Sequence, residues 1–548
     1  MSHPAGPTTT DAADGVIVVE RGDRPTIAPE ALVGLLADGG ELAVLDVRDE
    51  RDFADGHLLH AASVPLSTLE LDLERLLPRH SVRVIVTDGG SGNRSERAID
   101  VLRARGYDQV TPLAGNAHTW EAAGLGVFTG VHVRSKAVGE TTWGIPSIPA
   151  IDALELDRRR ESGEDLVVVD TRTVLEIEDQ RIPGSIACPG PELVHRVRDL
   201  APSPETLVVV TCAGRTRGLV GAHSLIDAGL PNPVAWLEDG TNGWRFAGLA
   251  LEDGPIELPG PPSPDARAWA AAAAERVAAT AGVETADAST VARLRAERQR
   301  RTLYLFDVRT REEYEGGHVA DSHWVAGGQL AQELDAHVAV RGARIVLIDD
   351  PDATRSRFTA LWLRRQGAGD VYVAPDLLAT EPLISGDEPT EPIPAPEGVL
   401  TTDLQALRDG LDAGETVMVD VADSRTYAAG HIPEAWFAIR ARLTEERPVL
   451  PEAVRYVITS PTGELAGLAV GELQELTSAP VLALKGGTAA WAAAGLPIET
   501  GIGRRLTEPD DLWGPDVNDE EQFRAFFAEY RVWCEQVAGQ IERTGGWE

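Results

Sequence analysis

One unit recurs four times along the 548-residue chain, and this repetition constrains the fold more than any other feature. Each copy begins with an apolar run that ends in an acidic residue: Asp46, Asp170, Asp307 and Asp420. Eleven residues after each acid stands a second mark: His57, Arg181, His318 and His431. A unit of roughly 100 residues is the size of a small domain, so the sequence predicts four tandem domains of one kind.

Every copy also holds a second short run rich in valine, isoleucine and leucine, at 82–86, 207–210, 344–348 and 456–458. Runs of this kind are typical of central strands in a parallel sheet. Three copies close with a glycine-then-tryptophan element, at 115–120, 240–244 and 486–491. Strands that alternate with helices at this length predict an α/β fold, with a small parallel sheet flanked by helices in each copy.

Changes in composition separate the copies. A Pro/Gly-rich stretch at 254–265 precedes an alanine-rich helix, and the Pro/Glu segment at 381–397 is typical of a linker. Near the C-terminus, aromatic and apolar residues at helical spacing predict an amphipathic helix packed on the body; they are Phe523, Phe526, Phe527, Tyr530 and Val537. The predicted domains are 22–130, 141–254, 282–383 and 398–500, followed by a C-terminal helical tail at 501–548.

The chain is strongly acidic, with 50 Lys+Arg against 87 Asp+Glu and a formal net charge of -37. Such a surface repels phosphate backbones and anionic lipids, so we expect neither nucleic acid nor membrane partners. The N-terminal residues lack the basic start and apolar core of a signal peptide. Three cysteines, Cys188, Cys212 and Cys534, fit neither a disulfide framework nor a zinc pattern. We therefore expect a cytoplasmic protein without a bound metal.

The loop that follows the second strand is where a domain of this type presents backbone N–H groups to solvent. Forty-two residues after the first-strand acid, copies one to three carry Asp88, Cys212 and Asp349, and copy four aligns Ser460 there. Of these four residues, Cys212 alone is a strong nucleophile. Copies one, three and four are therefore predicted to be inactive, and the acidic loop around Asp349 is expected to be solvated rather than to bind a metal.

Copy two continues from Cys212 into a helix through Ala213, Gly214, Arg215, Thr216, Arg217 and Gly218, which we call the cradle. A tight loop at a helix N-terminus directs several N–H groups inward and favours an anion. The helix dipole and Arg217 act in the same sense, so we predict a lowered pKa for the Cys212 thiol. The small residues Ala213 and Gly214 allow the backbone to approach a bound sulfur closely.

The Asp-x-Arg entry, the Gly-His-Ile-Pro turn, the strand–Cys–loop–Arg–helix centre and the closing Gly-Gly-x-x-x-Trp resemble the rhodanese (sulfurtransferase) superfamily. Its members are small α/β domains whose loop cysteine alternates between thiol and persulfide. The resemblance implies that Cys212 is the catalytic nucleophile, that the cradle binds the substrate, and that Asp170 and Arg172 support the loop. Four residues separate Cys212 from Arg217, which is similar to the sulfur-transferring members rather than to the longer loop of phosphatase-like relatives.

The resemblance implies a sulfurtransferase that takes sulfane sulfur from a small anionic donor, thiosulfate or a persulfide. The acceptor would be cyanide, a thiol or a sulfur-carrier protein, and no cofactor is implied. Arg215 and Arg217 would suit an anionic donor. The cradle sequence matches neither the usual thiosulfate loop nor the mercaptopyruvate type, so the donor stays open. Because three copies lack the cysteine, the alternative is a non-catalytic scaffold of rhodanese domains, or a redox- or persulfide-sensing binding module.

Two cysteines and three histidines fall outside this loop. Cys188 is small and flanked by apolar residues, and Cys534 lies within the tail helix, so both are expected to be packing residues, with a resolving-thiol role as the alternative for Cys188. The recurring histidines are expected to lie in turns or helix caps rather than to bind a ligand, because an arginine replaces them in the copy that carries Cys212.

Overall fold

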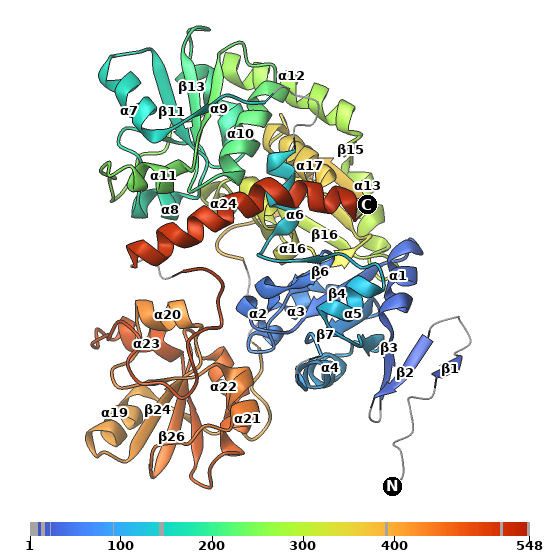
Figure 1. Ribbon diagram of the computed structural model, residues 1–548, viewed down its shortest axis with the longest axis vertical. Helices are drawn as coiled ribbons and strands as arrows, with labels where there is room; N and C mark the ends of the chain where they lie inside the picture. Colours follow the sequence, from blue (N-terminus) through green and yellow to red (C-terminus); the bar gives the residue numbers. More distant parts are fainter. Residues whose placement is uncertain are drawn as a thin grey trace.

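The computed structural model contains the four α/β domains that the repeat predicts, with helices between domains 1 and 2 and between domains 2 and 3, and a long helix near the C-terminus (Figure 1). The structure describes residues 9–11, 17–21, 24–90, 92–141, 147–388, 393–515 and 519–544. No helix within these residues is both long enough and apolar enough to span a membrane.

Domain 2 contains a five-stranded parallel sheet with the strand order β10-β14-β13-β11-β12. The strands are β10 (Ala150–Ile151), β11 (Leu166–Asp170), β12 (Ile186–Ala187), β13 (Leu207–Thr211) and β14 (Val234–Leu237). The helices are α7 (Ala153–Glu161), α8 (Val174–Asp179), α9 (Glu192–Leu200), α10 (Thr216–Asp227) and α11 (Gly240–Phe246). Asp170 lies opposite Thr211 in the register, so the first-strand acid and the Cys212 loop meet at one sheet edge.

Domains 3 and 4 repeat this sheet, with the orders β15-β21-β20-β16-β18 and β23-β27-β26-β24-β25. The domain 3 elements are β15 (Glu284–Thr285), β16 (Leu303–Asp307), β18 (His323–Trp324), β20 (Arg344–Ile348), β21 (Asp370–Ala374), α13 (Ala288–Ala296), α14 (Arg311–Gly316), α15 (Gly327–Gln332), α16 (Leu334–His337), α17 (Thr354–Arg365) and α18 (Leu377–Thr380). The domain 4 elements are β23 (Thr401–Thr402), β24 (Thr416–Asp420), β25 (Trp436–Phe437), β26 (Arg455–Thr459), β27 (Val481–Leu484), α19 (Leu404–Asp412), α20 (Ser424–Ala429), α21 (Arg440–Glu446), α22 (Glu464–Gln474) and α23 (Gly487–Ala493).

Domain 1 differs because its sheet includes a strand from domain 3, β19 (Val340–Arg341), which pairs antiparallel with β4. The other elements are β3 (Arg24–Ile27), β4 (Leu42–Asp46), β6 (Ala61–Ser63), β7 (Arg83–Thr87), β8 (Val110–Pro112), α1 (Pro29–Ala37), α2 (Glu50–Asp55), α3 (Leu69–Leu76), α4 (Arg94–Ala104) and α5 (Ala117–Ala122). Short antiparallel pairings involve β1 (Thr9–Asp11), β2 (Ile17–Arg21), β5 (His57–Leu58), β9 (Val127–Phe128), β17 (His318–Val319) and β22 (Leu383–Ile384).

Three further helices lie outside the repeated units: α6 (Val133–Glu140), α12 (Pro264–Ala281) and α24 (Glu520–Arg543). The amphipathic tail helix predicted from the aromatic spacing is α24, which lies across domain 2 and beside α6 (Figure 1). Its buried residues include Phe527, Cys534 and Val537, as the apolar spacing predicts. Helix α12 packs between domains 2 and 3, where Phe358 joins the core of domain 2.

The domains share cores as well as surfaces. One apolar cluster joins β4 and β7 of domain 1 to Tyr304 and Phe306 of domain 3. Between domains 1 and 4, Arg440 donates to both oxygens of Glu70 at 2.8 and 2.9 Å. Buried apolar side chains and ion pairs thus connect neighbouring domains. The domains therefore pack against one another and are not independent units joined only by linkers.

Candidate active site

Cys212 lies directly after β13 and before α10, at the carboxyl edge of the domain 2 sheet. Its side chain is 3% exposed. The backbone N–H groups of Gly214 and Gly218 interact with the thiol, and a Cβ added at Gly218 would lie 3.6 Å from the sulfur. The cradle therefore directs N–H groups at Cys212, which is the arrangement that favours a sulfur anion.

The pKa prediction for Cys212 was wrong in direction. Burial raises the pKa of this thiol above its ordinary value, and this effect exceeds the opposite effects of Arg217 and of the two glycine N–H groups. A thiol that is removed from water loses the hydration that its charged form needs. The loop pattern predicts the donors that stabilise a thiolate, but the degree of burial comes from helices far away in the sequence.

The raised pKa predicts the reactivity of Cys212. We expect alkylation by iodoacetamide to be slow at pH 7 and to keep accelerating above pH 9, because the rate follows the thiolate fraction and the folded-state pKa lies above the ordinary 9.0. Peptide mapping by mass spectrometry across a pH series measures this rate, with free cysteine in the same reaction as the reference. A rate that reaches its plateau below pH 8 would contradict the assignment.

The glycine-then-tryptophan element of domain 2, at 240–244, holds the cradle in place through backbone hydrogen bonds. At the start of α11, the N–H groups of Thr241 and Asn242 donate to the carbonyls of Cys212 and Ala213 at 2.9 and 3.0 Å. Gly240 has φ +56°, and a Cβ added there would overlap the Cys212 carbonyl oxygen. Glycine is required at this position by both the left-handed backbone and the close approach of the loop.

Asp170 is the last residue of β11 and lies opposite Thr211, the residue before Cys212, and Arg172 follows two residues later. The Arg172 guanidinium donates to Asp170 at 2.8 Å and to the Gln180 carbonyl at 2.6 Å, and both charged side chains are buried. The N–H and hydroxyl of Thr171 both donate to the Thr211 carbonyl at 3.0 Å. This network joins the ends of β11 and β13, so it supports the loop without contacting the sulfur.

Both arginines of the cradle form ion pairs with carboxylates. The sequence did not predict these pairs. Arg217 forms a two-pronged ion pair with Glu176, with both distances 2.6 Å, and also donates to Gln329 of domain 3 at 3.2 Å. Arg215 pairs with Glu140 at 2.8 Å and lies over the Trp236 ring. Arg217 also lowers the Cys212 pKa electrostatically, so it acts on the thiol while it is paired with Glu176.

The C-terminal helix α24, which lies outside the repeat, covers the cradle. The Phe527 ring of α24 lies against Gly214, where an added Cβ would come within 3.2 Å of the ring. On the same helix, Tyr530 interacts with the Thr216 hydroxyl and with the Cys534 thiol, while Glu535 pairs with Arg215 at 3.6 Å. The aromatic spacing predicted only that this helix packs on the body. Its position over Cys212 has no signal in the sequence, because nothing in the helix identifies the surface that it covers.

The three other loops hold their side chains in the same kind of N–H cradle. Asp88 accepts from the Ser95 N–H at 3.1 Å, and Asp349 from the Ser356 N–H at 2.9 Å. The Ser460 hydroxyl oxygen accepts from the N–H groups of Gly463 and Ala466 at 3.1 and 3.2 Å. In each copy an oxygen acceptor takes the place of the Cys212 sulfur.

The arginines of the loops in domains 1 and 3 bind neighbouring domains. Arg94 pairs with Glu445 of domain 4 at 2.9 Å. Arg355 pairs with Glu192 of domain 2 and with Glu313 at 2.6 Å, and with Asp349 at 2.9 Å. These two arginines thus contribute to the contacts between domains.

The remaining cysteines are buried, as expected for packing residues. Burial raises the pKa of Cys188 to about 12 and that of Cys534 to about 11. No group of metal-binding side chains is found among the residues that the structure describes. The three histidines stack on the aromatic ring four residues earlier, and each Nδ1 lies 2.9–3.0 Å from that residue's carbonyl oxygen.

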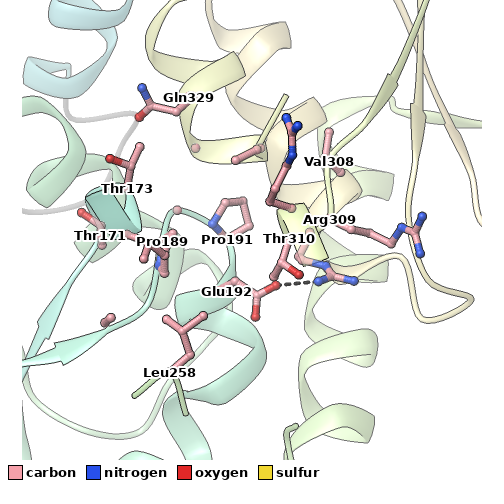
Figure 2. A pocket seen from close by; sticks show the side chains of 18 of the residues that line it. Thr171, Thr173, Pro189, Pro191, Glu192, Leu258, Val308, Arg309, Thr310 and Gln329 are labelled. Atoms are coloured by element: carbon pink, nitrogen blue, oxygen red, sulfur yellow. Dashed lines mark hydrogen bonds and ion pairs between the residues drawn. The ribbon is translucent and has the colours of Figure 1, made fainter. Parts of the chain in front are cut away.

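A cavity of about 560 Å³ lies between domains 2 and 3, and Figure 2 shows the residues that line it. Thr171, Pro189 and Pro191 come from domain 2, and Val308 and Arg309 from domain 3. The dashed line in Figure 2 marks the ion pair of Glu192, whose partner is Arg355. Cys212 does not line this cavity, so the cavity is not the entrance to the thiol.

Comparisons with known proteins agree with the repeat. The family model for the rhodanese-like domain matches residues 28–123, 152–247, 289–375 and 403–494, more than half of the chain. A crystal structure of a thiosulfate sulfurtransferase from Pseudomonas aeruginosa is 40% identical, with a TM-score of 0.87, and the match covers 95% of this chain and 98% of that one. A helix-turn-helix-type transcriptional regulator from Mycobacterium tuberculosis is 29% identical over 220 residues, which is 40% of this chain and 88% of the regulator. Four matched domains, arranged as in the Pseudomonas structure, show that the chain belongs to the rhodanese-like domain family.

Proposed function

We propose that this protein is a sulfurtransferase that carries sulfane sulfur on Cys212. The observation that carries the proposal is a nucleophilic thiol inside a cradle of N–H groups, present in one of the four copies. The similarity to the Pseudomonas aeruginosa thiosulfate sulfurtransferase, which extends over nearly the whole chain, supports sulfur transfer and suggests thiosulfate as the donor.

The proposed reaction has two steps. The Cys212 thiolate attacks the outer sulfur of thiosulfate, a sulfur–sulfur bond forms at Cys212, and the bond within the donor breaks so that sulfite leaves with the electron pair. The persulfide anion is then held by the N–H groups of Gly214 and Gly218. In the second step cyanide or a thiolate attacks the terminal sulfur, the persulfide bond breaks, and the Cys212 thiolate is regenerated. A sulfur-carrier protein could supply such a thiolate.

One observation favours the alternative, a scaffold or a persulfide-sensing module. Cys212 is buried and its pKa is raised, so the resting thiol is mostly protonated at neutral pH. A buried, protonated thiol reacts slowly, which favours a scaffold, whereas a sulfur-transferring enzyme needs a thiol that reacts on every turnover. Turnover therefore separates the two functions.

Incubation with thiosulfate followed by intact-mass analysis tests the proposal. The wild-type protein should gain one sulfur atom, lose it on addition of cyanide, and release thiocyanate over many turnovers. Cys212→Ser should gain none, whereas the control Cys188→Ser, at another buried cysteine of the same domain, should load normally. Loading without turnover would support the sensing module, and the absence of loading from thiosulfate and from a persulfide donor would exclude the enzyme.

A further inference from the structure

Within the part of the chain that the structure describes, one cation near Cys212 forms no ion pair with a carboxylate. Arg217 is neutralised by Glu176, and Arg215 by Glu140 with Glu535 nearby. An anionic donor that enters the cradle would therefore meet guanidinium groups that already hold carboxylates. A further positive charge near the sulfur is needed to make the site attractive to an anion.

Lys136 of α6 is the cation that remains. Its side chain is 8% exposed, and among the residues that the structure describes no carboxylate forms an ion pair with its ammonium and no acceptor receives a hydrogen bond from it. Its electrostatic neighbours are the thiols of Cys534 and Cys212, together with Arg217 and Glu333. Lys136 and Lys485 are the only lysines in the sequence, so this position is unusual for the chain.

Helix α6 packs against the cradle at the start of α10. A Cβ added at Gly139 would lie 3.3 Å from a side-chain carbon of Thr216, and Ser135 and Val138 line a small cavity together with Thr216 and Arg217. Helix α24 lies along the other side of α6 (Figure 1). Lys136 is thus enclosed between the cradle and the C-terminal helix, outside the matched rhodanese-like segments.

A buried ammonium without a counter-ion is unfavourable for folding. Burial lowers the pKa of Lys136, and the nearby thiols oppose this effect when they are ionised. An anion bound beside Cys212 would supply the missing counter-charge. The folded protein therefore keeps a destabilising cation at the place where an anionic ligand would compensate it, which is typical of binding sites rather than of cores.

We propose that Lys136 binds the negatively charged group of the sulfur donor at Cys212 and, after transfer, pairs with the persulfide anion. This inference rests on the proposed sulfurtransferase function and deepens it, because it identifies the donor as anionic and places its charge beside α6. No bond is made or broken at Lys136 itself; it acts through its charge.

The test measures thiosulfate binding by titration calorimetry on full-length Cys212→Ser protein, in which no sulfur can be transferred. Adding Lys136→Gln should weaken thiosulfate binding by about 30-fold or more, because one partner of a buried charge pair is lost. Lys136→Arg should retain most of the binding. The control Lys485→Gln, at the exposed second lysine, should leave binding unchanged.

Two further readouts separate binding from folding and from the proposed function. The temperature of thermal unfolding without ligand should be unchanged or higher in Lys136→Gln, since an uncompensated charge is removed. Equal thiosulfate affinity in the presence and absence of Lys136 would overturn the inference even if the Cys212 protein loads sulfur. A wild-type protein that neither binds thiosulfate nor gains sulfur would overturn both this inference and the proposed function.

Discussion

Gly240→Ala is expected to reduce sulfur loading of Cys212 by about 100-fold or more, since misplacing a reacting group by even 1 Å can have an effect of this size. The added methyl group would overlap the Cys212 carbonyl oxygen, and the φ of +56° disfavours alanine. The loop must move, and the N–H groups of Gly214 and Gly218 then no longer converge on the sulfur. Intact-mass analysis after a timed exposure to thiosulfate measures the loading rate.

Domain 4 offers a matched control for this substitution. Gly487 has φ +59°, and a Cβ added there would overlap the Ser460 carbonyl oxygen in the same way. The N–H of Thr488 donates to that carbonyl at 3.0 Å, as the N–H of Thr241 does to Cys212. Gly487→Ala should therefore carry a similar strain of about 1–3 kcal/mol without changing the loading rate. Equal losses in the two variants would show that strain acts through global stability and not through the cradle.

Arg355→Met is expected to lower the free energy of unfolding by about 3–5 kcal/mol, because removing one partner of a buried ion-pair network leaves the others uncompensated. Arg355 is 2% exposed on its side chain and pairs with Glu192, Glu313 and Asp349. Methionine fills a similar volume but removes the cation that these carboxylates share, and Glu192 keeps only Arg196 at 2.7 Å. The lowest-temperature transition in a calorimetric scan of the full chain is the measurement, since four domains need not unfold in one step.

The control for this variant is Arg357→Met, two residues along the same helix. Arg357 is only partly buried and donates to the Asp352 carbonyl at 3.2 Å. Its loss should change the transition by less than about 1 kcal/mol, as for most partly exposed positions. A transition at the same temperature in Arg355→Met and Arg357→Met would contradict the role assigned to the buried network.

The repeat predicted the four α/β domains because hydrophobic periodicity and loop spacing are local signals. The strands that end at Asp46, Asp170, Asp307 and Asp420 are β4, β11, β16 and β24. Cys212 likewise lies directly after β13, as the local motif predicts, and Arg172 donates to Asp170 within the same domain. Both features depend on residues within one domain, where the sequence separation is small and the fold repeats.

The ionisation state of the site could not be predicted in this way. The Cys212 pKa depends on burial beneath α6 and α24, and α24 follows Cys212 by about 300 residues in a chain whose domains pack in three dimensions. The pairing of Arg215 with Glu140 also comes from α6, outside the repeat. Long-range packing has no periodic signal, so the sequence indicates which groups are present but not which of them are already neutralised.

Two of the loops without cysteine form ion pairs with other domains. In domains 1 and 3 the arginine that would serve a sulfur anion instead holds a glutamate from another domain, Glu445 or Glu192. A carboxylate and a persulfide are both compact anions. A loop that can bind a sulfur anion can therefore also bind a carboxylate from a neighbouring domain. Returning a cysteine to position 88 or 349 would therefore place a thiol in a loop whose arginine also contacts another domain, as Arg94 contacts Glu445 and Arg355 contacts Glu192.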